Sequence, residues 1–169
     1  SEFKDDTSMT LDNTFEEYFD DAYPIAKQMW ADALDVTVSD ATESTADIVY
    51  YGITTEDYYL KTGQPVEGWI GLTVYNEPQY VGYRFLSGSS SKVINVYEFQ
   101  NQVTVYVLCD YPSSLDVITE VFVHEMGHAL GYMGHSTNTT DVMWKQAHSD
   151  YILSDTEKQH LYQIYRTYN

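Results

Sequence analysis

Residues 124–135 read His-Glu-Met-Gly-His-Ala-Leu-Gly-Tyr-Met-Gly-His, and this stretch decides how the rest of the chain is interpreted. His124 and His128 are four residues apart, so on a helix both imidazole rings project from the same face. Two nitrogens placed in this way can bind one Zn²⁺ at about 2.0–2.1 Å. Glu125, next to the first histidine, is placed to contact a metal-bound water rather than the metal. The segment therefore predicts a helix that carries a zinc site.

Gly131 and His135 complete the predicted site. Gly131 suits a helix C-terminus, where a residue with positive φ turns the chain sharply. That turn can bring His135 back as a third ligand and leave the fourth metal position for water, as a catalytic zinc site requires. A structural zinc site instead has four protein ligands, usually including cysteines, whereas Cys109 is the only cysteine of the chain. The pattern therefore predicts a catalytic site.

This segment resembles the signature of the metzincin clan of zinc endopeptidases, His-Glu-x-x-His-x-x-Gly-x-x-His followed by a methionine-bearing turn. Residues 135–143 are similar to the matrixin (matrix-metalloproteinase-like) version, in which a serine follows the third histidine and the turn methionine comes eight residues after it. Met143 stands at that position, and the resemblance implies that it forms an apolar floor beneath the three histidines. A weaker resemblance extends over residues 22–169.

The chain departs from the family pattern in three places. Gly134 occupies the position expected for the third ligand, so His135 is expected to reach the metal through a local bulge. Thr156-Glu157 stands where matrixins carry an acidic pair. The middle of the chain lacks the His- and Asp-rich loop that holds structural zinc and calcium in vertebrate matrixins. We therefore expect a minimal bacterial-type enzyme with one catalytic Zn²⁺, and nothing in the sequence indicates structural calcium.

Four segments with apolar periodicity predict helices. Each begins at a capping residue or at a proline, which fits the first turn of a helix. The predicted helices start at Thr14, Pro24, Ser113 and Ser154, and the third runs to about Leu130.

Between the second and third predicted helices the pattern becomes extended, and runs rich in Val, Ile, Tyr and Thr predict strands. These runs are residues 36–38, 46–53, 69–75, 80–86, 92–99 and 102–109. Helices grouped before and after a run of strands imply an α+β architecture. The family resemblance implies a zincin-like (metzincin-like) fold, with a twisted, mixed five-stranded sheet, a backing helix, an active-site helix, a C-terminal helix and a cleft between N- and C-terminal subdomains.

We expect one folded domain preceded by a short arm. Residues 1–13 are polar and acidic and are interpreted as a loosely held N-terminal arm. Residues 14–169 are expected to form a single metalloprotease catalytic domain. Its upper subdomain is expected at about residues 14–131 and its lower subdomain at about residues 132–169.

The composition excludes several classes of protein. A net charge of −18 argues against binding to nucleic acids or anionic membranes, because their phosphates would repel the chain. No stretch approaches about 18 consecutive apolar residues, so no membrane span is predicted. With 43% hydrophobic and 15% aromatic residues, the chain does not have the composition of a disordered one.

These features predict a secreted, extracellular zinc-dependent endopeptidase in its mature form, since the first residues lack the apolar core of a signal peptide. Glu125 is expected to act as general base on the zinc-bound water and to pass the proton to the leaving amine. The protein or peptide substrate is expected to lie extended along an exposed sheet edge. Either residues 80–86 or residues 92–99 would provide that edge. We expect a monomer.

Two alternatives stay open at this point. In a gluzincin-like zinc peptidase, Glu157 from the last helix would supply the third ligand. That pattern needs an aspartate four residues later, where this chain has Leu161. The other alternative is an extracellular binding module that retains zinc without turnover.

Overall fold

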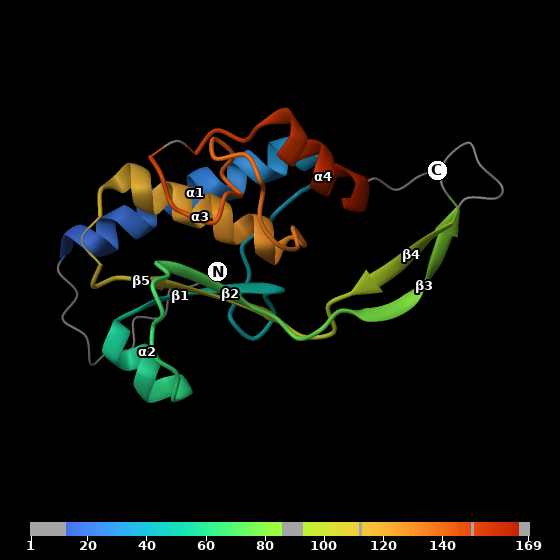
Figure 1. Cartoon of the computed structure of the whole chain (residues 1–169). Coiled ribbons are helices and arrows are strands. Elements are labelled where there is room, and N and C mark those ends of the chain that lie inside the picture. Colours follow the sequence, from blue (N-terminus) through green and yellow to red (C-terminus); the bar gives the residue numbers. More distant parts are fainter. Residues whose placement is uncertain (1–12, 86–92, 112, 150, 166–169) are drawn as a thin grey trace.

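The computed structural model describes residues 13–85, 93–111, 113–149 and 151–165. Within these residues the chain has a mixed α+β fold, with four helices around a small sheet (Figure 1). Helices α1 (Asn13–Leu34) and α3 (Leu115–Ala129) pack together over one face of the sheet, and α2 (Thr55–Thr62) lies at the other face. Helix α4 (Asp155–Tyr165) packs against α1. None of the described helices is long and apolar enough to cross a membrane.

The central sheet has three strands in the order β1-β5-β2. Strands β1 (Ile48–Ile53) and β5 (Val103–Leu108) are parallel, whereas β2 (Gly71–Val74) runs antiparallel to β5. Alternate residues of β5 belong to different clusters, as the two-residue period of a strand requires. Its valines are buried in the main core under α1 and α3, and Tyr106 and Leu108 pack in a smaller cluster at α2.

The remaining two strands correct the expectation of one five-stranded sheet. Strands β3 (Gln79–Phe85) and β4 (Val93–Glu98) pair only with each other among the described residues, in a hairpin that extends away from the central sheet (Figure 1). The register shifts between Tyr80 and Gly82, and such a bulge increases the local twist. Tyr80 and Tyr97 are more than half exposed, so the hairpin does not bury them against the central sheet.

Helix α1 is continuous, whereas the sequence predicts a separate helix that starts at Pro24. The proline removes a backbone bond to the carbonyl of Asp20, but both residues are exposed, so water can replace that bond. A buried stripe runs across the proline and holds the helix against the core; it consists of Phe19, Ala22, Ala26 and Trp30. Of the predicted N-terminal arm, residues 1–12 lie outside the described residues.

Helix α2 is not predicted, although both of its ends carry recognisable signals. At the start, the Thr54 side chain accepts a hydrogen bond from the backbone N–H of Asp57. At the end, Gly63 adopts the left-handed conformation with φ 71°. The segment has no apolar periodicity that would indicate a helix, because its apolar residues form one short run, residues 58–60, flanked by five polar residues.

Residues 36–38, predicted as a strand, have no regular secondary structure. Asp35 has a positive φ of 53°, which ends α1 with a sharp turn. The backbone N–H of Val36 then donates to the carbonyl of Ala31 at 3.2 Å. This bond closes the turn at the end of α1, and residues 36–38 pair with no strand among the described residues.

The contact between α1 and α3 depends on a close approach at Gly127. Trp30 of α1 is fully buried, and its Nε1–H donates to the carbonyl of Val123 at 2.8 Å. A Cβ atom added at Gly127 would lie 2.9 Å from the Trp30 ring and 2.5 Å from Sδ of Met143. Glycine is therefore required where the tryptophan and the methionine meet the helix.

We predict that Gly127→Ala lowers the free energy of unfolding by about 1–3 kcal/mol, because the added methyl overpacks this contact. The effect should appear even though alanine favours a helix over glycine by about 1 kcal/mol. Urea unfolding of the metal-free protein measures it.

A double-mutant cycle with Met143→Ala identifies the cause. Truncating the methionine opens the space that the new methyl needs, so Gly127→Ala should cost less in that background. An equal cost in both backgrounds would show that Met143 does not limit the space at Gly127.

Candidate metal centre

Helix α3 ends one residue after His128, and its C-terminus turns the chain sharply. The N–H of Gly131 donates to the carbonyl of His128, and the N–H of Tyr132 donates to that of Gly127, each at 2.9 Å. This pair of bonds is a Schellman motif, and Gly131 supplies the positive φ that it needs, 106°. The predicted place of Gly131 at the end of the helix is confirmed.

His124 and His128 each have one ring nitrogen fixed by a backbone carbonyl. Nδ1 of His124 lies 2.6 Å from the carbonyl oxygen of Val142, and Nδ1 of His128 lies 2.7 Å from that of Tyr132. A carbonyl only accepts, so Nδ1 carries the proton in each ring and Nε2 is left with a lone pair. Burial lowers the pKa of His124 to about 3 and also lowers the pKa of His128, so both rings are neutral at neutral pH.

The two Nε2 atoms of His124 and His128 face each other at 3.0 Å. With both protons on Nδ1, neither nitrogen can donate, so this contact brings two lone pairs together instead of forming a hydrogen bond. Two nitrogens on one tetrahedral zinc lie about 3.3 Å apart when each bond is about 2.0–2.1 Å. The donor set of this pair therefore fits a shared metal ion.

His135 joins the pair as the third member of the cluster. Ligand nitrogens of the three histidines all lie within 4.8 Å of one another, so together they can hold a metal ion. The ring centroid of His135 lies 5.4 Å from that of His124 and 5.1 Å from that of His128. Gly134, with φ 78°, precedes His135 and accommodates the extra residue in the loop. His135 is exposed, so the cluster faces solvent on its side.

The loop after His135 is closed by a buried carboxylate. Asp141 accepts hydrogen bonds from the Ser136 hydroxyl at 2.7 Å and from the Asn138 side-chain amide at 2.9 Å. The backbone N–H of Ser136 donates to the carbonyl of Met143 at 2.7 Å. These bonds tie the two ends of the loop together, so His135 and Met143 belong to one compact turn.

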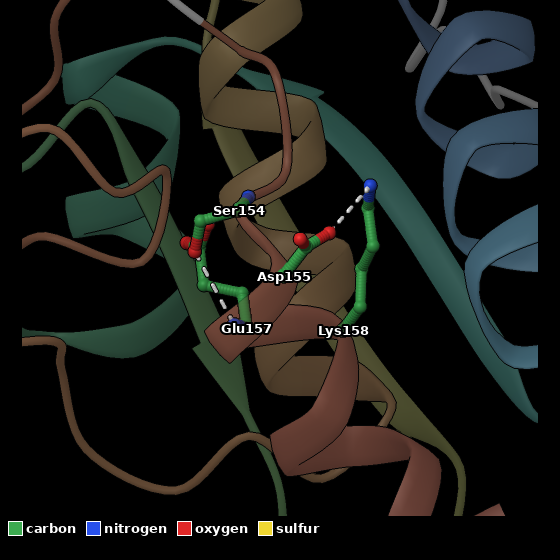
Figure 2. A network of polar contacts seen from close by, with 4 residues as sticks. All are labelled: Ser154, Asp155, Glu157 and Lys158. Atoms are coloured by element: carbon green, nitrogen blue, oxygen red, sulfur yellow. Dashed lines mark hydrogen bonds and ion pairs between the residues drawn. The ribbon is translucent and has the colours of Figure 1, made fainter.

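Helix α4 holds the backbone of Met143 through Glu157. One oxygen of the Glu157 carboxylate accepts from the Met143 N–H at 2.7 Å, and the other accepts from the Ser154 N–H at 2.8 Å. The N–H of Glu157 donates to the Ser154 hydroxyl at 3.3 Å, which completes the predicted capping box (Figure 2). Both oxygens of this buried carboxylate are thus used by backbone amides, which argues against Glu157 as the third metal ligand.

Glu125 lies against the edge strand β2. The hydroxyl of Thr73 donates to Oε2 of Glu125 at 2.6 Å. A Cβ atom at Gly71 would lie 2.7 Å from Cγ of Glu125, so the missing side chain there leaves room for the glutamate. Burial raises the pKa of Glu125 to about 7, while hydrogen bonds from the Thr73 side chain and backbone lower it. A dication held by the neighbouring histidines would also favour the ionised carboxylate.

A second buried carboxyl group, Glu120, lies on the same helix. Burial, together with the charges of Glu125 and Glu157, raises the pKa of Glu120 to about 8. The backbone of His148 lowers this pKa but does not offset the effect of burial. Glu120 is therefore protonated at neutral pH.

Sequence reasoning missed three residues around the cluster: Gly71, Thr73 and Glu120. The first two share a strand face by their spacing, but the sequence does not show which helix that face meets. Glu120 had a visible signal, because it interrupts an apolar run four residues before His124 and so lies on the same side of the helix.

Comparison of the sequence with models of protein families gave no match, and comparison with curated proteins gave none either.

We predict that the chain binds one Zn²⁺ and that zinc raises its unfolding temperature, because a ligand of the folded state stabilises it by mass action. His135→Ala should weaken zinc binding by more than about 100-fold, since loss of a direct ligand should exceed the effect of outer-shell changes. His160→Gln, an exposed histidine of α4, should bind zinc like the wild type. Competition with a chromogenic chelator measures the affinities, and equal values for all three proteins would contradict the assignment.

We also predict that Glu120→Gln stabilises the metal-free protein in a pH-dependent way. Between pH 4.5, the ordinary pKa of the group, and pH 8, the unfolded chain loses the Glu120 proton while the folded chain keeps it. Wild-type stability therefore falls over this range, whereas glutamine cannot ionise. The advantage of the variant should grow to about 1–3 kcal/mol at pH 8.

Urea unfolding at pH 4–9 tests this prediction, with Asp116→Asn in the exposed first turn of α3 as the matched control. The control should show no comparable growth in stability with pH. A difference between Glu120→Gln and wild type that is the same at every pH would contradict the raised pKa.

Proposed function

We propose that this chain is a zinc-dependent endopeptidase of the matrixin type, with His124, His128 and His135 as metal ligands and Glu125 as general base. The observation that carries the proposal is the pair of opposed Nε2 lone pairs of His124 and His128, with the buried carboxylate of Glu125 on the residue after His124. Secretion and a monomeric state are further expectations of the same proposal.

The chemistry divides between the metal and the carboxylate. A zinc ion with three neutral imidazole ligands supplies a strong Lewis acid, which polarises a peptide carbonyl and lowers the pKa of water. Glu125 then accepts the proton of the attacking water and delivers it to the leaving amine. The Thr73 hydroxyl holds this carboxylate in place through its hydrogen bond. Met143 packs against α3 at Gly127, which lies between His124 and His128 in the sequence.

We propose the open edge of β2 as the binding site for an extended peptide. The N–H of Leu108 donates to the carbonyl of Ile70 at 2.8 Å, so residues 72 and 74, two and four positions on, also face β5. The N–H and C=O groups of Gly71 and the C=O of Thr73 then point away from β5, where a substrate strand can pair with them. We propose this edge in place of residues 80–86 and 92–99, since β3 and β4, which cover the described parts of those segments, pair with each other in the separate hairpin.

We predict that Glu125→Gln lowers the rate of peptide hydrolysis by about 10²–10⁴-fold, the usual contribution of a general base. Zinc stoichiometry should stay at one, because the amide leaves the histidines unchanged. Cleavage of an unfolded protein substrate and metal analysis of the same samples measure both quantities.

Asp116→Asn is the matched control, since it makes the same change of carboxylate to amide on the first turn of the same helix. It should cleave at the wild-type rate. Wild-type turnover by Glu125→Gln would remove the general-base assignment. A zinc-loaded wild type that hydrolyses no peptide bond would favour the binding module instead.

A further inference from the structure

Two residues on the side of β2 that faces α3 lie next to Glu125. One of them, Gly71, has no side chain, and the other, Thr73, has a hydroxyl group. Gly71 and Thr73 pair with Val107 and Val105 of β5, respectively. These valines belong to the core beneath α3, so Gly71 and Thr73 share that face. One position gives space to the glutamate and the other gives it a hydrogen bond.

We propose that Thr73 is a positioning residue for the reaction: its hydroxyl fixes the orientation of the Glu125 carboxylate, while its backbone forms part of the edge that binds the substrate. This inference rests on the proposed peptidase function. It adds that the residue that orients the base is also the residue with which the peptide pairs.

The space around Glu125 leaves the hydroxyl with a specific task. A Cβ at Gly71 would lie 2.7 Å from Cγ of Glu125 and 2.8 Å from its Oε1. The glutamate thus lies directly against the strand backbone and is 5% exposed. A carboxylate with so little access to water depends on protein donors for its orientation.

The Thr73 hydroxyl is the side-chain donor, beside the backbone hydrogen bond from the same residue. Its oxygen lies 2.6 Å from Oε2 of Glu125 and 3.1 Å from the backbone carbonyl of the same residue. A hydroxyl has one hydrogen, and the shorter distance and the charged acceptor assign that hydrogen to the carboxylate. Without the hydroxyl, Oε2 of Glu125 would lose this side-chain donor and the carboxylate could rotate about χ3.

The backbone of Thr73 connects this bond to substrate binding. Its C=O points to the open side of β2, as the phase of the β2–β5 ladder requires, and its N–H on the same side hydrogen-bonds to the Glu125 carboxylate. A peptide that pairs with the backbone of Thr73 fixes the position of this residue. The hydrogen bond from the Thr73 hydroxyl then fixes the position of the Glu125 carboxylate relative to the bound peptide. Loss of the hydroxyl should therefore reduce kcat and leave KM nearly unchanged, because the backbone that binds the peptide is retained.

The test compares Thr73→Val, which removes the hydroxyl at nearly constant volume, with Thr73→Ser, which retains it. Thr104→Val is the matched control, because Thr104 lies on β5 and faces away from α3. Kinetics use an extended fluorogenic peptide, with zinc affinity measured on the same samples. Crystal structures of the zinc-loaded wild type and Thr73→Val add a readout that does not depend on turnover.

We expect kcat to fall by about 10–100-fold in Thr73→Val, as for other outer-shell changes, with KM and zinc affinity within about threefold of wild type. Thr73→Ser and Thr104→Val should keep the wild-type kcat, and the Glu125 carboxylate should be rotated only in the valine variant at position 73. An unchanged kcat or an unrotated carboxylate in Thr73→Val would overturn this inference alone. Full activity of Glu125→Gln would instead overturn the proposed function.

Discussion

Two backbone carbonyl groups set the chemistry of the histidine cluster. The carbonyls of Val142 and Tyr132 accept from Nδ1 of His124 and His128, so both Nε2 lone pairs are directed at the same point. Each carbonyl is itself held by backbone structure, since Tyr132 belongs to the turn that ends α3 and Val142 follows the buried Asp141. The two carbonyls lie before and after His135 in the sequence, and each fixes the orientation of one imidazole ring. The rings of His124 and His128 therefore have little rotational freedom.

The last helix takes part in the same arrangement through one carboxylate. Glu157 joins the first turn of α4 to the backbone of Met143, and the Met143 carbonyl joins Ser136 beside the third histidine. The sulfur of Met143 packs against Gly127 of α3, the helix that carries His124 and His128. Segments that are distant in the sequence therefore meet in one buried unit, and a change in any of them is expected to move the others.

Features that depend on local backbone geometry can be predicted from the sequence. Features that depend on contacts between residues far apart in the sequence cannot. The spacing of His124 and His128 and the turn at Gly131 follow from helix period and φ, so they could be predicted directly. The edge strand could not, because the runs at 69–75, 80–86 and 92–99 have the same strand pattern and only pairing with β5 distinguishes the first. Pro24 shows the same limit, since local preference favours a helix start whereas packing keeps α1 continuous.

The bond from Trp30 to Val123 joins residues that are 93 positions apart. On a ribosome that adds roughly 5–20 residues per second, α3 is completed several seconds after α1 has emerged. During that interval the apolar stripe of α1 has no α3 to cover it, so the part of the core between the two helices can form only after residue 129 has been synthesised. A net charge of −18 would oppose association of unfolded chains during that interval, because like charges repel.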